Sequence, residues 1–232
     1  MKNIHFIGAF DKLDLILYVA KTLKMLGNKV LIVDATQIEK SKYIVPSINP
    51  TRTYLTQFDE MDVAVGFNSF QEIEEYMITV ENRRMEYDYV LTDIERQEAF
   101  VNFYNQDTVK TYFVTSLEAY SIRRGVETIG QIQQPVPMKR ILFSSNPKQD
   151  DIHYIEFLSL GYRVAWEDEV INFPYDTQDL EVMMDNEKSH RISIKNLSPQ
   201  YKDQLQYLIV DIIPDINLND LRRVMKIMEK EG

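Results

Sequence analysis

The sequence predicts an α/β fold, in which helices cover both faces of a doubly wound, mostly parallel sheet of about seven strands. The main observation is the stretch from Asn3 to Thr36, where an apolar run ending at Gly8 is followed by helical spacing and a second apolar run. Similar short apolar runs then alternate with helical patterns along the chain. Two parallel strands joined by a crossover helix are the unit of a doubly wound domain, and the first turn of that unit faces the ligand crevice.

Length and composition set the class of protein. The 232 residues fit one α/β domain, so we expect residues 1–232 to form a single domain. The formal net charge of −10 argues against a nucleic-acid surface, because phosphate contacts need a basic stripe. The lack of cysteine excludes disulfides, thiolate metal sites and cysteine nucleophiles. With no signal-peptide pattern and no apolar run of about 20 residues, a cytoplasmic location is expected.

The first strand–helix–strand unit is the clearest part of the pattern. Residues 3–8 predict its first strand, and residues 14–26 predict its helix. The apolar stripe of that helix consists of Ile16, Ala20, Leu23 and Leu26. Gly27 suits a left-handed helix end, and the apolar run that starts at Val30 stops at Asp34. The second strand therefore ends in a carboxylate.

The next part of the chain combines an irregular stretch with a third strand and a helix. Residues 35–56 are polar, contain Pro46 and Pro50, and are not expected to hold one regular element. Residues 62–67 alternate as a strand does. Ser69 and Glu72 form a capping box that starts the next helix. Its predicted buried side consists of Ile73, Met77 and Val80.

The remaining elements continue this alternation. Strands are predicted at residues 87–93, 111–115, 139–145 and, at one edge of the sheet, 162–166. Helices are predicted at residues 118–132, ended by Pro135 and Pro137, and at residues 150–160, ended by Gly161. The acidic residues 172–193 predict a loop with one helical turn. Ser198-Pro199 starts a helix that ends at Pro214, and Asn219 or Asp220 starts a last helix that reaches Glu231.

Several segments together resemble one known family. They are Ile7–Leu13 (IGAFDKL), Tyr18–Ala20 (YVA), Gly27–Asp34 (GNKVLIVD), Tyr87–Asp93 (YDYVLTD) and parts of Phe113–Gly125. They are similar, in order, to the phosphate loop K-G-G-V-G-K-T and the segments N-L-A, G-x-K-V-L-L-I-D, Y-D-Y-V-I-I-D and V-T-x-P-E-x-x-S-L-R-D of ParA/MinD-type ATPases. These are P-loop proteins with a deviant Walker motif. The resemblance covers residues 1–146 well and implies a P-loop NTPase fold.

The phosphate loop departs from the pattern of that family. A working loop needs glycines so that consecutive backbone N–H groups can turn toward phosphate oxygens. Gly8 is retained, but Ala9 and Asp11 replace glycines, and Asp11 puts a carboxylate where a phosphate should sit. Leu13 replaces the hydroxyl that binds Mg²⁺, and Ile7 replaces the signature lysine that reaches across a dimer. Only Lys12 keeps the position of the lysine that contacts the β- and γ-phosphates.

Two functions are compatible with this degenerate Walker A motif. The first is a pseudo-ATPase without catalytic residues or cofactor, resembling the TadZ/CpaE-like localisation factors that serve membrane-associated machines such as pilus and secretion systems. The second is a nucleotide-binding ATPase with an atypical P-loop, used as a regulatory switch, in which Gly8, Lys12, Asp34 and Asp93 handle ATP and Mg²⁺. Apart from that possibility, no metal site is expected, because the three histidines lack metal-ligand spacing.

The same residues also allow plainer interpretations. Lys12 could be a solvated turn lysine, or it could pair with Asp11 or Asp34. Asp34 and Asp93 end strands, and strand-end aspartates often cap the next turn. We favour this capping role over a role in binding Mg²⁺ or activating water.

Protein partners are expected, including a homodimer through the face that carries the nucleotide crevice. Tyr43, Tyr54 and Phe58 are candidate interface anchors, although they could instead pack over the sheet edge. Residues 217–232 combine a one-sided apolar stripe with basic side chains and resemble the membrane-targeting tail of MinD-like proteins. The same stripe is equally expected for a helix docked on its own domain.

Overall fold

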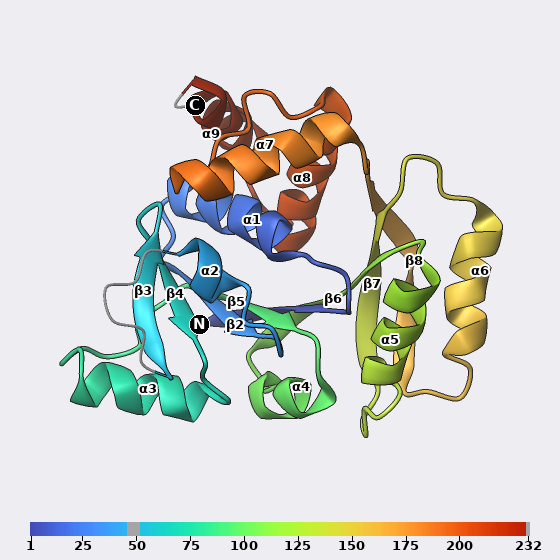
Figure 1. The fold of residues 1–232 in the computed structure, drawn as a ribbon, viewed down its shortest axis with the longest axis horizontal. Helices are drawn as coiled ribbons and strands as arrows, with labels where there is room; N and C mark the ends of the chain where they lie inside the picture. The colour runs from blue at the N-terminus through green and yellow to red at the C-terminus, as the bar shows by residue number, and fades with distance from the viewer. Residues whose placement is uncertain (46–51, 231–232) are drawn as a thin grey trace.

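The computed structural model describes residues 1–45 and 52–230. Within them, eight strands form one sheet in the order β3-β4-β2-β5-β1-β6-β7-β8, and every neighbouring pair is parallel except β3 and β4. Helices cover both faces of this sheet (Figure 1). The predicted fold class is therefore confirmed, with eight strands instead of about seven.

The central strands are buried on both faces because helices cover both sides. The strands are β1 (Lys2–Ile7), β2 (Val30–Ala35), β3 (Tyr54–Phe58), β4 (Met61–Val65), β5 (Tyr89–Ile94), β6 (Thr108–Ser116), β7 (Val136–Phe143) and β8 (Val164–Phe173). The helices are α1 (Leu13–Met25), α2 (Ser41–Ile44), α3 (Phe70–Thr79), α4 (Gln97–Phe103), α5 (Ala119–Ile129), α6 (Gln149–Leu158), α7 (Thr177–Ser189), α8 (Pro199–Ile212) and α9 (Leu218–Lys230).

Two hydrophobic cores lie on opposite faces of the sheet. In β2, Val30 and Ile32 belong to the core shared with α1, α7, α8 and α9, whereas Leu31 and Val33 belong to the core shared with α3, α4, α5 and α6. This alternation follows from the two-residue period of a strand. Figure 1 shows the two helical layers above and below the sheet. Of the helices, α1 has the longest unbroken buried run, Leu15 to Leu23, because α8 and α9 pack over it.

The strand β3 corrects the expectation that residues 35–56 hold no regular element. It pairs antiparallel with β4, and its end residues Tyr54 and Phe58 are buried. Of the two interpretations of these side chains, packing at the sheet edge therefore holds and a role as exposed interface anchors does not. Tyr43 is 75% exposed and stays available. Polar residues inside β3 obscured its pattern. Pro46 and Pro50 lie outside the described residues.

Two elements near the carboxyl end were also predicted wrongly. The edge strand β8 runs from Val164 to Phe173, well beyond residue 166, and α7 occupies most of the stretch expected to be a loop. In α7 only Asp179, Met183 and Asn186 are buried, so its apolar stripe is too narrow to recognise. The signal that the sequence does offer is Asp176, whose carboxylate accepts a hydrogen bond from the Asp179 N–H and caps the helix.

Smaller corrections concern α3 and α5. The side chain of Ser69 accepts from the Glu72 N–H, as predicted, but Val80 is exposed because α3 ends at Thr79. The helix α5 ends at Ile129, so the prolines do not end it, and Pro137 lies in β7.

The predicted start of α8 is confirmed, because the Ser198 hydroxyl accepts from the Tyr201 N–H.

Buried charges join α8 to the sheet. The Lys139 ammonium on β7 lies 2.5 Å from Asp211 of α8 and 3.1 Å from Glu169 of β8. The other oxygen of Asp211 accepts from the Tyr112 hydroxyl at 2.6 Å. Burial alone would lower the pKa of Lys139, but the carboxylates around it raise that pKa above its usual range. The network therefore fixes α8 by charge as well as by apolar packing.

The last helix is docked on the rest of the chain. Its stripe residues Leu221, Val224, Met225 and Met228 are buried in the core around α1, and the Met228 sulfur lies 3.6 Å from the Thr22 hydroxyl. The predicted end at Glu231 falls outside the described residues. No helix in the described part of the chain has the length and apolar character needed to span a bilayer.

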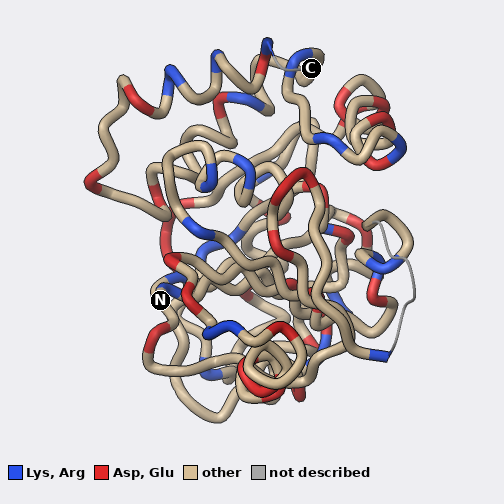
Figure 2. Tube along the Cα trace, turned by 90° about the vertical axis from the view of Figure 1, so that its left-hand side faces the viewer, with Lys and Arg blue, Asp and Glu red and all other residues tan. Residues whose placement is uncertain are grey.

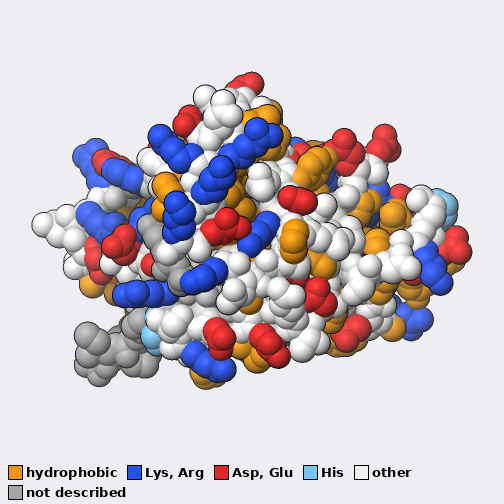
Figure 3. Space-filling model, turned by 90° about the horizontal axis from the view of Figure 1, so that it is seen from above, with side chains coloured by type: hydrophobic (Ala, Val, Ile, Leu, Met, Phe, Trp, Pro, Cys, Tyr) orange, Lys and Arg blue, Asp and Glu red, His pale blue; other side chains and the backbone are white. Residues whose placement is uncertain are grey.

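The charged face of α9 remains open to solvent. Its exposed basic residues are Arg222, Arg223, Lys226 and Lys230. Figure 3, which looks down on α7, α8 and α9, shows Lys and Arg gathered on one part of this surface. Elsewhere charges of both signs are interspersed along the trace (Figure 2).

The docked position of α9 predicts the response to truncation of its side chains. Met228→Ala should lower the free energy of unfolding by about 2–5 kcal/mol, because it empties a fully buried site. The matched control is Ile227→Ala, at a neighbouring position that is 39% exposed, with an expected loss below about 1 kcal/mol. Urea denaturation measures both. Equal, small losses would mean that α9 is not docked in solution.

Candidate functional site

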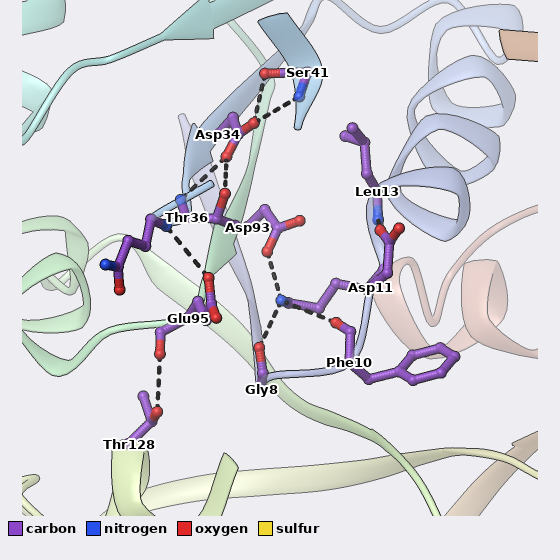
Figure 4. Close-up of polar contacts among 12 residues, drawn as sticks. Gly8, Phe10, Asp11, Leu13, Asp34, Thr36, Ser41, Asp93, Glu95 and Thr128 are labelled. Carbon is purple, nitrogen blue, oxygen red and sulfur yellow. Dashed lines mark hydrogen bonds and ion pairs between the residues drawn. The ribbon is translucent and has the colours of Figure 1, made fainter. Parts of the chain in front are cut away.

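The candidate site lies where the parallel strands β1, β2 and β5 end, in the loop between β1 and α1. Gly8 opens this loop with φ of +149°, and a Cβ at this position would lie 2.0 Å from the Val114 carbonyl oxygen. Because no side chain fits there, the conformation of the loop depends on this glycine. Figure 4 shows the loop and the strand ends around it.

The Lys12 side chain turns inward from this loop. Its Nζ lies 2.6 Å from Oδ1 of Asp93 and donates to the Gly8 carbonyl oxygen at 2.8 Å (Figure 4). Only 2% of Lys12 is exposed. Both plainer interpretations of Lys12 are therefore wrong: it is not a solvated turn lysine, and it pairs with Asp93 instead of Asp11 or Asp34.

Asp93 is buried at the end of β5. Burial raises the pKa of its carboxyl to about 7, although the ammonium of Lys12 opposes that shift. Asp34, its partner in the β2–β5 register, adds to the increase through its own negative charge. Because a folded-state pKa above the unfolded one favours the protonated form, the contribution of this carboxyl to stability falls as the pH rises from about 4 to 7.

Asp34 is used for capping. Its Oδ2 accepts from the N–H and hydroxyl of Ser41, at 2.9 and 2.5 Å, and its Oδ1 accepts from the N–H and hydroxyl of Thr36, at 3.1 and 2.7 Å. These four bonds hold the turn after β2 and the start of α2. The capping interpretation thus holds for Asp34, whereas Asp93 pairs with Lys12.

The amino end of α1, where a phosphate would bind, is occupied by the protein's own carboxylate. The Leu13 N–H donates to Oδ1 of Asp11 at 3.3 Å, and Oδ2 of Asp11 lies 2.8 Å from the Lys40 ammonium. The Leu13 side chain is buried in the core above the sheet and Ile7 in the core below it, so neither reaches the loop surface.

Lys40 is a site residue that the sequence did not single out. Besides Asp11, it pairs with Asp14 at 3.4 Å and with Glu187 of α7 at 2.7 Å. Burial raises the pKa of Asp14 to about 6. Burial alone would lower the pKa of Lys40, but Asp14 and Asp11 raise it above its usual value. Because its partners lie far away in sequence, no local pattern could have shown this cluster.

A small cavity of about 130 Å³ remains above the loop. It is lined by residues 8–12, Thr36, Ile38, Lys40, Asp93 and Glu95. Pockets for drug-sized ligands usually measure about 300–1,000 Å³, so this cavity is smaller than such a pocket. The charged groups of its lining are two lysines and three carboxylates, which further disfavours a polyanion.

The structure therefore brings Gly8, Lys12 and Asp93 into direct contact and leaves Asp34 beside them, engaged elsewhere. The three histidines lie on β1, in α6 and just after α7. Among the described residues, no cluster of three or more His, Cys, Asp or Glu side chains is arranged to hold a metal ion.

Comparison with known proteins identifies the fold. No protein-family model and no curated protein sequence matches the chain. Among solved structures, the MinC:MinD cell division complex of Aquifex aeolicus aligns with 16% identity and a TM-score of 0.54 over 97% of this chain and 96% of that one.

Two further structures give the same result. A ParA family ATPase from Chlorobium tepidum TLS aligns with 15% identity and a TM-score of 0.51 over 93% of this chain and 99% of that one. An ATP complex of a Cyanothece McdA variant aligns with 11% identity and a TM-score of 0.53 over 94% of this chain and 98% of that one. At these identities the likeness concerns the fold, which is that of the ParA/MinD-type P-loop NTPases.

The buried ion pair predicts a strong coupling between Lys12 and Asp93. Asp93→Asn should lower the free energy of unfolding by about 3–5 kcal/mol, because it leaves a buried ammonium uncompensated. The double variant Lys12→Met/Asp93→Asn should recover at least half of that loss, because neither charge is then left alone.

Chemical denaturation of the two single variants and the double variant gives the coupling energy. Glu95→Gln, at a partly exposed position near the pair, is the matched control and should cost less than about 0.5 kcal/mol. Strictly additive losses for Lys12→Met and Asp93→Asn would contradict the pairing.

Proposed function

We propose that this protein is a non-catalytic scaffold or localisation factor with a ParA/MinD-like fold, serving a membrane-associated machine such as a pilus or secretion system. The observation that carries the proposal is the Lys12–Asp93 ion pair, 2.6 Å long and almost fully buried. In this arrangement the one retained phosphate-binding side chain is already neutralised. A phosphate would have to displace a carboxylate that sits in direct contact with the lysine.

The rest of the loop supports the same conclusion. Asp11 accepts the Leu13 N–H that would otherwise face a phosphate, and Lys40 in turn neutralises Asp11. No hydroxyl is available at position 13 for Mg²⁺. Each group that a nucleotide would need is either missing or bonded to another part of the chain, so we propose that the protein works without ATP or Mg²⁺.

Such a protein would act through its surfaces, and the crevice face offers one. We define the crevice face as the surface around the cavity above residues 8–12. Ile38 lines that cavity and is 67% exposed, and Tyr43, in the same connection after β2, is 75% exposed. Exposed apolar and aromatic side chains are favoured interface anchors. We propose that a protein partner or a second copy of this chain binds there.

A contact with lipid would use a different surface. Because the apolar stripe of α9 is buried, residues 217–230 would meet a membrane mainly through the exposed basic side chains of α9, with Leu218 and Ile227 as the exposed apolar residues of the helix. Attraction of this kind is electrostatic and is screened by salt. It would be peripheral and reversible.

The alternative function is a nucleotide-dependent switch. What favours it is that Gly8, Lys12, Lys40 and Asp93 line the same cavity. Binding would require Lys12 to leave Asp93 and Asp11 to leave the amino end of α1. The two functions therefore predict opposite responses to Mg·ATP.

A thermal shift with Mg·ATP separates them. A nucleotide present at 100 times its dissociation constant would stabilise the protein by about 2.7 kcal/mol. For a chain of this size that corresponds to an increase in Tm of roughly 5–10 °C. We expect an increase below about 1 °C at about 5 mM Mg·ATP. A larger increase that is lost in Lys12→Ala would establish the switch instead.

A dimer through the crevice face is tested by Ile38→Asp. The wild-type protein should sediment as a dimer and the variant as a monomer, because a charge then replaces an apolar side chain in the interface. The matched control is Leu218→Asp, which changes a 51% exposed side chain at the start of α9, a helix that packs near Asn28 and Tyr89, away from the crevice face. If the wild-type protein is a monomer, the homodimer is contradicted. The partner bound at the crevice face would then be a different protein.

A further inference from the structure

A second cavity, of about 150 Å³, lies beside the first one and shares Phe10 and Asp11 with it. It is enclosed by the start of α1, the carboxyl ends of β7 and β8, and the helices α7 and α8. Its lining consists of Phe10, Asp11, Asp14, Leu15, Phe143, Pro174, Tyr175, Asp176, Asp179, Leu180, Met183 and Tyr201. This lining holds four aspartates and not one lysine, arginine or histidine among the described residues.

Aromatic rings form one wall of this second cavity. Phe10 stacks on Phe143 with ring centroids 4.7 Å apart and meets the edge of Tyr175 at 5.7 Å. Behind them Phe173 stacks on Phe143 at 5.3 Å and packs against Tyr201 at 4.8 Å. Because the rings hold one another in place, the wall is already formed without a ligand. Aromatic faces attract cations as well as apolar groups.

The carboxylates give the second cavity a negative character. Asp179 accepts from the N–H and the hydroxyl of Ser198, which are neutral donors, and Asp176 accepts from the Asp179 N–H. Lys40 pairs with Asp11 and Asp14, but it shares its charge with Glu187 as well. Burial raises the pKa of Asp14 to about 6 and also raises that of Asp179. A cation in the cavity would relieve this excess of negative charge.

The Tyr201 hydroxyl provides a second observation, separate from the charges, that indicates a ligand site. This side chain is fully buried, lines the cavity, and has a hydroxyl with no hydrogen-bond partner among the described residues. Burial raises the pKa of that hydroxyl well above its usual value, and Tyr18, Asp14 and Asp179 add to the increase. Buried hydroxyls are normally bonded, because an unmade hydrogen bond is costly. An N–H group of a ligand that reached the Tyr201 oxygen would satisfy it.

We propose that this second cavity binds a guanidinium or ammonium group on a short apolar stem, such as an arginine or lysine side chain. The aromatic and aliphatic walls suit the stem, and the aspartates with Tyr201 suit the charged head. A volume half the lower bound for drug-sized pockets fits one side chain and excludes a nucleotide. The inference concerns a cation and does not rest on the proposed loss of ATP binding.

The cation could belong to a free small molecule or to a partner polypeptide, and NMR titration of the intact protein separates the two. Methionine methyl groups are labelled with ¹³C, and the Met183 signal reports on the cavity. The probes are N-acetyl-arginine amide, a blocked Leu-Arg-Leu tripeptide, and N-acetyl-citrulline amide as the neutral control of the same shape. If the tripeptide binds at least tenfold more tightly than N-acetyl-arginine amide, the ligand is part of a polypeptide. If the two affinities are equal, the ligand is a free cation.

We expect a saturable shift of the Met183 signal with both arginine probes and a response at least tenfold weaker with citrulline. Asp14→Asn should weaken binding at least tenfold. Tyr201→Phe should weaken it severalfold while leaving Tm unchanged or higher, because the hydroxyl it removes has no partner among the described residues. Asp203→Asn removes an exposed charge of α8 outside the cavity and should have no effect.

Three results would overturn the proposal. They are the absence of a saturable shift, an equal response to citrulline, and an equal loss of affinity in Asp203→Asn and Asp14→Asn. The last result would mean that the acidic surface attracts cations without a specific site. Since Tyr201→Phe is expected to fold normally, a severalfold loss of affinity in this variant would locate the binding in the cavity.

Discussion

The buried ammonium of Lys12 is the constraint on which the crevice edge of this protein depends. A charge that is removed from water has to be neutralised nearby, and Asp93 does so at 2.6 Å, while the Gly8 carbonyl oxygen accepts a hydrogen bond from the ammonium at 2.8 Å. The Val114 carbonyl leaves no room for a side chain at position 8, so this conformation of the loop depends on Gly8. In the structure, Lys12 therefore joins the loop to β5.

The same logic extends to the surrounding segments. In a loop that binds phosphate, the backbone N–H groups and the positive end of the helix are free to bind an anion. Here the anion is Asp11, and Lys40 links Asp11 to Asp14 and to Glu187 of α7. Asp34 holds the turn from which Lys40 comes. Loop, turn and helix are thus joined by charge pairs internal to the chain. The excess of carboxylates on the α7 side of the loop explains why the neighbouring cavity suits a cation.

The sequence predicted what depends on local pattern. The strands that carry Asp34 and Asp93 near their ends and the capping by Ser198 follow from apolar periodicity and a few capping residues. The ParA/MinD fold was implied by the resemblance of several sequence segments to that family, and the solved structures agree with it. It failed for β3 and α7, whose polar, half-exposed faces conceal a narrow apolar stripe. At the site, Gly8, Lys12 and Asp93 were recognised, but the partner of Lys12 and the role of Lys40 depend on residues far away along the chain, so they are visible only in three dimensions.

The central claim is that the anion site is filled by the protein itself, and a crystal structure grown with saturating Mg²⁺ and a non-hydrolysable ATP analogue tests it most directly. The account predicts electron density in which Lys12 pairs with Asp93 and the Asp11 carboxylate lies at the start of α1, with no nucleotide above residues 8–12. A triphosphate seated over that loop, with Lys12 turned toward its oxygens, would contradict it.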